Sequence, residues 1–120
     1  MLRKFAIPVL LWSTVTAVSA QSPSPVATVQ YSCANGKSLT AAYFDGPTRT
    51  APDGRPIPGG RVVLTLADGK QLTLPQTLSG SGIRYANEGE SLIFWSKGDT
   101  AFVEEGPNRT VTYENCVGKR

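Results

Sequence analysis

From Val26 onward, short segments in which apolar and polar residues alternate are separated by turns rich in glycine, proline and asparagine. Alternation with a period of two is typical of β-strands that turn one face to a core, and no stretch has a convincing helical pattern. About eight short strands with turns between them predict an all-β sandwich or closed barrel. The stretches that we expect to form strands are 26–33, 38–44, 61–67, 70–74, both arms of a hairpin across 81–97, 100–105 and 109–116.

Two details of this pattern concern single residues. Pro75 is expected to end the strand over 70–74, because proline lacks the N–H that a central strand needs. In the last strand, Val111 and Tyr113 are expected to face inward together, since residues two apart share a face.

The first twenty residues have the pattern of a secretory signal peptide. Arg3 and Lys4 precede a short apolar run that ends in small residues, so cleavage is expected after Ala20. The run falls short of the ~20 apolar residues of a membrane span, and Gln21 stands where a lipid-modified cysteine would follow. We therefore expect a periplasmic protein without a membrane anchor. The predicted boundaries are a leader over 1–20, a disordered lead-in over 21–25 and one domain over 26–118.

The chain has two cysteines, Cys33 and Cys116. An even number in an exported protein favours one disulfide, which would be worth about 4.5 kcal/mol in the chain-entropy model. Two thiols without a CxxC spacing make a poor zinc site. The bond would join the first and last predicted strands, which fits closure of a barrel, since these two strands would otherwise be neighbouring edges.

Residues 45–60 carry four prolines and four glycines, which do not suit a central strand. We interpret them as a long surface loop. Disorder is favoured over a role at the rim of a partner, although both are known for loops of this length.

Charge and composition argue against several classes of partner. The precursor carries a net charge of +3, which falls to +1 once Arg3 and Lys4 are removed, and no basic cluster remains. Nucleic acid is therefore not expected as a partner. Histidine is absent, so the usual general base and the commonest metal ligand are missing, and we expect no metal and no cofactor.

The stretch from Leu78 to Phe102 reads as a β-hairpin, because two β-rich arms flank a glycine-containing turn. If the hairpin is symmetric about Gly89, Ser81 lies opposite Lys97 at the rim of the sheet. Directly opposite residues share a face. The residues expected on one apolar face are Ile83, Tyr85, Ile93 and Trp95.

Two blocks of this hairpin carry a family resemblance. They are Ser81-Gly82-Ile83-Arg84-Tyr85 and Phe94-Trp95-Ser96-Lys97-Gly98. Together with Tyr31-Ser32-Cys33, Leu74-Pro75 and Cys116, they resemble the bacterial inhibitors of c-type lysozyme, a family with membrane-bound and periplasmic branches. The missing lipid-attachment cysteine makes this chain more similar to the periplasmic branch.

The resemblance implies a small antiparallel barrel and c-type lysozyme as the partner. In the family, the serine of the first block and the lysine of the second enter the lysozyme cleft and engage its two catalytic carboxyls. Here these residues are Ser81 and Lys97, and Gly82, Arg84 and Tyr85 are the further lysozyme-binding candidates. Gly82 is expected to allow special backbone angles or close approach of the partner. The family includes monomers and dimers, so either state is expected.

Two other functions fit the same residues. Ser81 as nucleophile and Lys97 as base would make a Ser–Lys hydrolase, but a barrel rim is too wet for a lysine base. A lipocalin-like carrier would hold a small ligand inside the barrel. The short chain argues against it, because small barrels fill with their own side chains.

Overall fold

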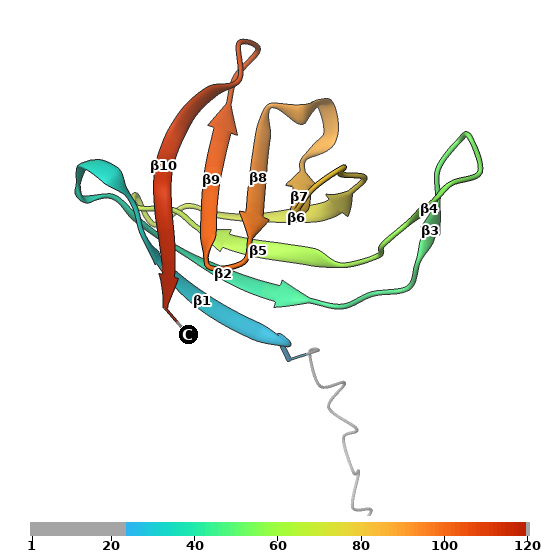
Figure 1. The fold of residues 1–120 in the computed structure, drawn as a ribbon, viewed down its shortest axis with the longest axis horizontal. Coiled ribbons are helices and arrows are strands. Elements are labelled where there is room, and N and C mark those ends of the chain that lie inside the picture. The colour runs from blue at the N-terminus through green and yellow to red at the C-terminus, as the bar shows by residue number, and fades with distance from the viewer. Residues whose placement is uncertain (1–23, 120) are drawn as a thin grey trace, which may run out of the picture.

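The alternating segments form a closed antiparallel barrel in the computed structural model, which describes residues 24–119 (Figure 1). The strand order around the barrel is β1-β10-β9-β8-β7-β6-β5-β2, so the first and last strands are neighbours. The barrel strands are β1 (Ala27–Ser32), β2 (Ser38–Phe44), β5 (Arg61–Thr65), β6 (Gln71–Thr77), β7 (Ile83–Ala86), β8 (Leu92–Lys97), β9 (Thr100–Glu105) and β10 (Thr110–Lys119). The all-β barrel prediction is confirmed.

The predicted signal peptide over 1–20 and most of the lead-in over 21–25 lie outside the described residues. Within residues 24–119, the helices are two short 3₁₀ turns, and none is long and apolar enough to cross a bilayer.

All eight strands contribute to one core. Alternation along the strands, interrupted in β10, brings the residues of one face together inside the barrel. The most deeply buried large side chains are Val62, Leu64, Leu74, Ile93, Phe94 and Val103, of which all but Ile93 belong to this core. Val62, Leu64, Leu74 and Val103 lie at positions where the alternation predicted inward-facing residues. Phe94 does not, because its neighbours Ile93 and Trp95 were expected on the apolar face instead.

Pro75 does not end its strand, contrary to expectation. It lies inside β6 opposite Arg61 of β5. The next residue, Gln76, donates its N–H to the carbonyl of Gly60 over 2.8 Å. In an antiparallel ladder, pairs with and without hydrogen bonds alternate. Pro75 and Arg61 therefore form a pair without hydrogen bonds between the two strands. The missing N–H of Pro75 thus removes no hydrogen bond to β5.

Val111 does not face inward with Tyr113, because β10 is bulged. The register against β9 shifts between Val111 and Tyr113, and again before Cys116. The second bulge includes Asn115, which has a φ of 53°. Each bulge inserts one residue and moves the following side chains to the other face. Val111 is thus 44% exposed, whereas Tyr113 and Cys116 point into the core.

The segment over 45–60 is ordered, so the preference for disorder was wrong. It forms a separate two-stranded sheet of β3 (Arg49–Thr50) and β4 (Pro56–Ile57). Its base is closed by Gly46 and Gly59, whose backbones approach so closely that neither has room for a Cβ atom. The glycines that suggested a flexible loop instead permit this close approach.

Consecutive hairpins place the connections alternately at two ends of the barrel. We call the end with the turns at 33–37, 66–70, 87–91 and 106–109 the turn end. The loop end has the longer connections 45–60 and 78–82, the turn at 98–99 and the end of β10. In Figure 1 the arrowheads of β8 and β10 point to the loop end.

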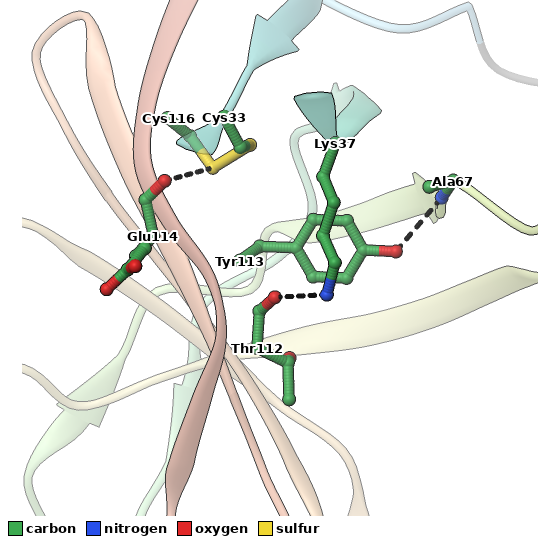
Figure 2. Close-up of a disulfide and its surroundings, with 7 residues drawn as sticks. All are labelled: Cys33, Lys37, Ala67, Thr112, Tyr113, Glu114 and Cys116. Carbon is green, nitrogen blue, oxygen red and sulfur yellow. Dashed lines mark hydrogen bonds between the residues drawn. A yellow bond between two sulfur atoms is a disulfide. The ribbon is translucent and has the colours of Figure 1, made fainter. Parts of the chain in front are cut away.

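The turn end carries the disulfide. Figure 2 shows Cys33, which follows β1, bonded to Cys116 of β10, as predicted. Beside it, the Lys37 ammonium donates a hydrogen bond to the Thr112 carbonyl over 2.8 Å and lies 4.8 Å from the centre of the Tyr113 ring.

The Tyr113 hydroxyl in turn accepts a hydrogen bond from the Ala67 N–H over 3.0 Å (Figure 2). One covalent bond and three polar contacts thus join β10 to two hairpin turns at this end.

Candidate functional site

The hairpin of β7 and β8 has its register shifted by one residue from the prediction. Arg84 lies opposite Trp95, and Tyr85 lies opposite Phe94. The cause lies in the turn, where Gly89 and Glu90 both adopt positive φ, at 79° and 55°. The turn is therefore centred between these two residues and not on Gly89.

This shift divides the predicted apolar face. Tyr85 is buried in the core, and Ile83 lies at the loop end with 40% of its surface exposed. Trp95 and Ile93 sit on the other side of β8, outside the barrel core. The four residues were each expected to be apolar scaffold, but the structure assigns them to two faces.

Ser81 and Lys97 are nevertheless neighbours at the loop end. The Lys97 ammonium donates a hydrogen bond to the Ser81 hydroxyl over 3.0 Å, and both side chains are exposed. Lys97 is the last residue of β8, whereas Ser81 lies in the loop that precedes β7. By the observed register, Gly82 and not Ser81 falls opposite Lys97.

The loop holds Ser81 through a residue that sequence reasoning missed. The Ser79 hydroxyl donates to the Ser81 carbonyl over 2.7 Å and accepts from the Ser81 N–H over 3.2 Å. A serine that bonds the backbone two residues on is a common turn device. The signal available in the sequence was the Ser-Gly-Ser-Gly run itself.

Gly82 fits only because it has no side chain. Its φ is +70°, and a Cβ atom there would lie 2.9 Å from the Ser96 carbonyl oxygen and 3.3 Å from Lys97 Cβ. The loop therefore rests directly on the end of β8. This contact brings Ser81 within reach of the lysine, and the positive φ is one of the special backbone angles expected of Gly82.

Arg84 lies behind the rim with 9% of its surface exposed. Its guanidinium donates to the Thr77 hydroxyl over 2.8 Å and pairs with the Glu90 carboxylate at 3.0 Å. It also lies 5.5 Å from the Trp95 ring. These contacts favour a role in bracing the hairpin over direct contact with a partner.

Tyr85 is 4% exposed and faces a cavity inside the barrel. The cavity has a volume of about 400 Å³ and opens at the loop end beside Lys97. Burial raises the pKa of Tyr85 to about 12, with a smaller contribution from the negative charge of Asp45. Burial likewise raises the pKa of Tyr43, whose hydroxyl lies 2.6 Å from that of Tyr31. Tyr43 and Tyr85 are therefore neutral at physiological pH.

The part of the chain that the structure describes contains no group of three or more cysteine or acidic side chains placed to hold a metal ion.

Comparison with known proteins identifies similar chains. Residues 56–112 match the family model described as membrane-bound lysozyme-inhibitor of c-type lysozyme, a span that includes Ser81 and Lys97. A membrane-bound lysozyme inhibitor of C-type lysozyme from Yersinia enterocolitica is 55% identical over 42 residues. That alignment covers 35% of this chain and 34% of the relative.

A second relative aligns over most of both chains. It is a membrane-bound lysozyme inhibitor of C-type lysozyme from Cupriavidus necator, 28% identical over 98% of this chain and 91% of its own length. No solved structure matches the chain significantly.

Proposed function

Because the chain belongs to an MliC-like family, we propose that it inhibits c-type lysozyme and is not itself an enzyme. The proposed mechanism inserts Ser81 and Lys97 into the active-site cleft of lysozyme. The observation that carries it is the hydrogen-bonded, exposed pair of one hydroxyl and one ammonium at the loop end.

The chemistry of the pair suits the target. A retaining glycosidase holds its two catalytic carboxyl groups only ~5–5.5 Å apart, one as a protonated acid and one ionised. The Lys97 ammonium would lie against the ionised carboxylate, in place of the positive charge that develops on the sugar. The Ser81 hydroxyl both donates and accepts hydrogen bonds, so it suits the protonated acid.

The geometry of the loop supports this proposal, because the pair is already in position. Ser79 fixes the backbone of Ser81, and Gly82 packs against β8. A surface that is already ordered loses less conformational entropy on association. In the complex, charge-assisted hydrogen bonds to Lys97 would be desolvated and roughly twice as strong as neutral ones.

The place of action follows from the leader. We propose that residues 1–20 direct export, that cleavage follows Ala20, and that the mature protein protects the cell wall from lysozyme in the periplasm. Both relatives are named as membrane-bound inhibitors. Gln21 at the expected lipid-attachment position supports an unanchored form of this chain.

The direct test is a turbidity assay of cell-wall lysis by c-type lysozyme, with and without the mature protein over residues 21–120. Dose-dependent inhibition is expected, and it should be weaker for Ser81→Ala, which loses one hydrogen bond worth about 1 kcal/mol. Undiminished lysis at a large molar excess of the folded protein would rule the proposal out.

The Ser81–Lys97 hydrogen bond is also what a Ser–Lys hydrolase would need. A lysine that serves as a general base has to be desolvated, however, and both members of this pair are exposed. An acyl-ester substrate separates the two functions. The hydrolase would give a burst of product equal to the protein concentration, whereas the inhibitor gives none.

A further inference from the structure

The cavity inside the barrel contradicts the expectation that so short a chain fills its barrel with side chains. Its volume of about 400 Å³ is within the range of pockets that hold small molecules, ~300–1,000 Å³. It is larger than one inserted amino-acid side chain would occupy. A free small molecule is therefore the occupant that its size favours.

The walls are aromatic and carry hydroxyl groups. The rings of Tyr43 and Tyr85 have centroids 6.0 Å apart, and each lies about 6 Å from Phe94 in the core behind them. Tyr31 and Tyr43 share a hydrogen bond of 2.6 Å. Within residues 24–119, no hydrogen bond is found for the Tyr85 hydroxyl, and the oxygen atom is accessible from the cavity. This hydroxyl is therefore free for a ligand.

The mouth carries more negative than positive charge. Asp45, from the end of β2, and Asp99, from the β8–β9 turn, both line the opening. Among the described residues of the lining, the one cation is Lys97, whose ammonium is already bonded to Ser81. Carboxylates only accept hydrogen bonds, and neutral phenols accept as well as donate. Aromatic faces attract cations through their quadrupole. The site thus offers acceptors and π-faces, which match a ligand rich in N–H donors.

We propose that this cavity is a binding site for a small organic cation, an ammonium or guanidinium group on an aromatic or other apolar body. The apolar body would lie against the tyrosine walls, with the cation between Asp45 and Asp99 at the mouth. Binding of such a cation does not depend on lysozyme inhibition. The site does share Gly82 and Lys97 with the proposed lysozyme-binding rim, so a bound cation would lie directly beside that rim.

The test is an NMR titration of the mature protein with three compounds of one shape and different charge. They are tryptamine as the cation, tryptophol as its neutral counterpart and indole-3-acetate as the anion. We expect tryptamine to shift the amides of Gly82, Tyr85, Ser96 and Gly118, which line the cavity. Its affinity should exceed that of tryptophol by about 10-fold, as ion pairs with Asp45 and Asp99 together would give. Indole-3-acetate should cause no shift.

Two variants locate the effect. Asp45→Asn should weaken tryptamine about 2- to 5-fold, as expected for loss of an exposed ion pair, and should leave tryptophol unchanged. Tyr85→Phe should weaken both compounds, because it removes a hydroxyl and no charge. The matched control is Asp68→Asn, at the turn end, which should change neither.

The proposal is wrong if none of the three compounds shifts the cavity amides, or if tryptophol or indole-3-acetate binds as tightly as tryptamine. Tighter binding of N-acetylglucosamine than of tryptamine would also overturn it, because it would identify the cavity as a site for neutral sugars. Loss of lysozyme inhibition is a separate result that leaves this titration interpretable, since the titration needs no lysozyme.

Discussion

The two ends of the barrel are built differently. At the turn end, a disulfide and the Lys37 and Tyr113 contacts bind β10 to two hairpin turns. The other two turns are joined there by an Arg109–Glu90 ion pair and by a hydrogen bond from the Gly106 N–H to the Ser91 carbonyl. At the loop end, the cavity is open, and Ser81 and Lys97 stay exposed with each other as partner.

The difference indicates a division of roles. Polar groups at the turn end are used in intramolecular bonds, which hold the barrel closed. At the loop end, the bonds from Ser79 fix the backbone and leave the Ser81 and Lys97 side chains accessible. A rigid scaffold that carries its binding residues on loops is a common arrangement. Changes at the turn end should therefore alter stability without altering binding, and changes at the loop end should alter binding.

The largest expected effect on stability comes from the disulfide. Replacing both cysteines, with Cys33→Ala and Cys116→Ala together, should lower the free energy of unfolding by about 2–5 kcal/mol, measured by chemical denaturation. Inhibition of lysozyme should stay within about 2-fold at a temperature where the variant is folded. A folded variant with strongly reduced inhibition would show that the two ends are not separate in function.

Two glycines with the same backbone angle allow a matched comparison. Gly36 at the turn end has φ +69° and open space, whereas Gly82 at the loop end has φ +70° and no room for a Cβ atom. Alanine at either position should cost about 1–3 kcal/mol through backbone strain, measured by thermal unfolding. Gly82→Ala should also weaken inhibition, because the loop has to move away from β8. Equal inhibition by the two folded variants would contradict this account of the loop.

Substitution of Glu90 tests whether its ion pairs stabilise the hairpin of β7 and β8. Its carboxylate pairs with the buried Arg84 and with the exposed Arg109. Glu90→Ala should destabilise the protein by about 1–2 kcal/mol, because it leaves the Arg84 guanidinium with fewer partners. In the control, Asp53→Ala breaks a pair of exposed side chains with Arg55, which should cost less than about 1 kcal/mol. Similar losses in the two variants would mean that the burial of Arg84 is unimportant.

Substitution of Ser79 tests whether inhibition depends on the hydrogen bonds that hold the backbone of Ser81. Ser79→Ala removes both bonds to the Ser81 backbone and should weaken inhibition about 5-fold, the equivalent of about 1 kcal/mol. Its melting temperature should match that of the wild type. Ser38→Ala, at an exposed position near the turn end, is the control and should change neither quantity. If Ser79→Ala inhibits as well as the control, Ser81 does not need this support.

The smallest expected effect on stability at neutral pH comes from the raised pKa values of Tyr85 and Tyr43 in the cavity. The folded-state pKa of Tyr85, about 12, lies above its ordinary value of 10.0. Its contribution to stability is therefore complete below pH 10 and is lost as the pH rises from 10 to about 12. Burial raises the pKa of Tyr43 in the same direction. In a spectrophotometric titration, Tyr85→Phe should remove absorbance that develops above pH 11. Loss of absorbance that develops near pH 10 would show that Tyr85 is not enclosed.

Much of the barrel was predictable, because alternation determines which residues can share a core. Val62 and Leu64 follow this rule in a straight strand. Val111 does not follow it, because β10 is bulged. The bulges depend on backbone angles such as the positive φ of Asn115, and residue propensities do not specify such angles. Ordering of 45–60 was also missed, since the contact between Gly46 and Gly59 joins residues distant in the sequence.

The candidate site was predicted in part. The resemblance indicated Ser81 and Lys97, and the structure places them 3.0 Å apart. The register of the hairpin was wrong by one residue, because Glu90 adopts a left-handed conformation that is uncommon for a glutamate. The cavity was not expected, because the space left inside a barrel depends on how all its side chains pack.

The central claim is that Lys97 supplies the decisive charge in the lysozyme cleft, and one pair of variants tests it most directly. The inhibition constant of Lys97→Ala should be compared with that of Lys70→Ala, which removes an exposed lysine at the turn end. Truncating one partner of a buried charge pair costs ~2–5 kcal/mol. The account therefore predicts that Lys97→Ala raises the constant about 30-fold or more, whereas Lys70→Ala leaves it unchanged. Equal inhibition by the two folded variants would contradict the account.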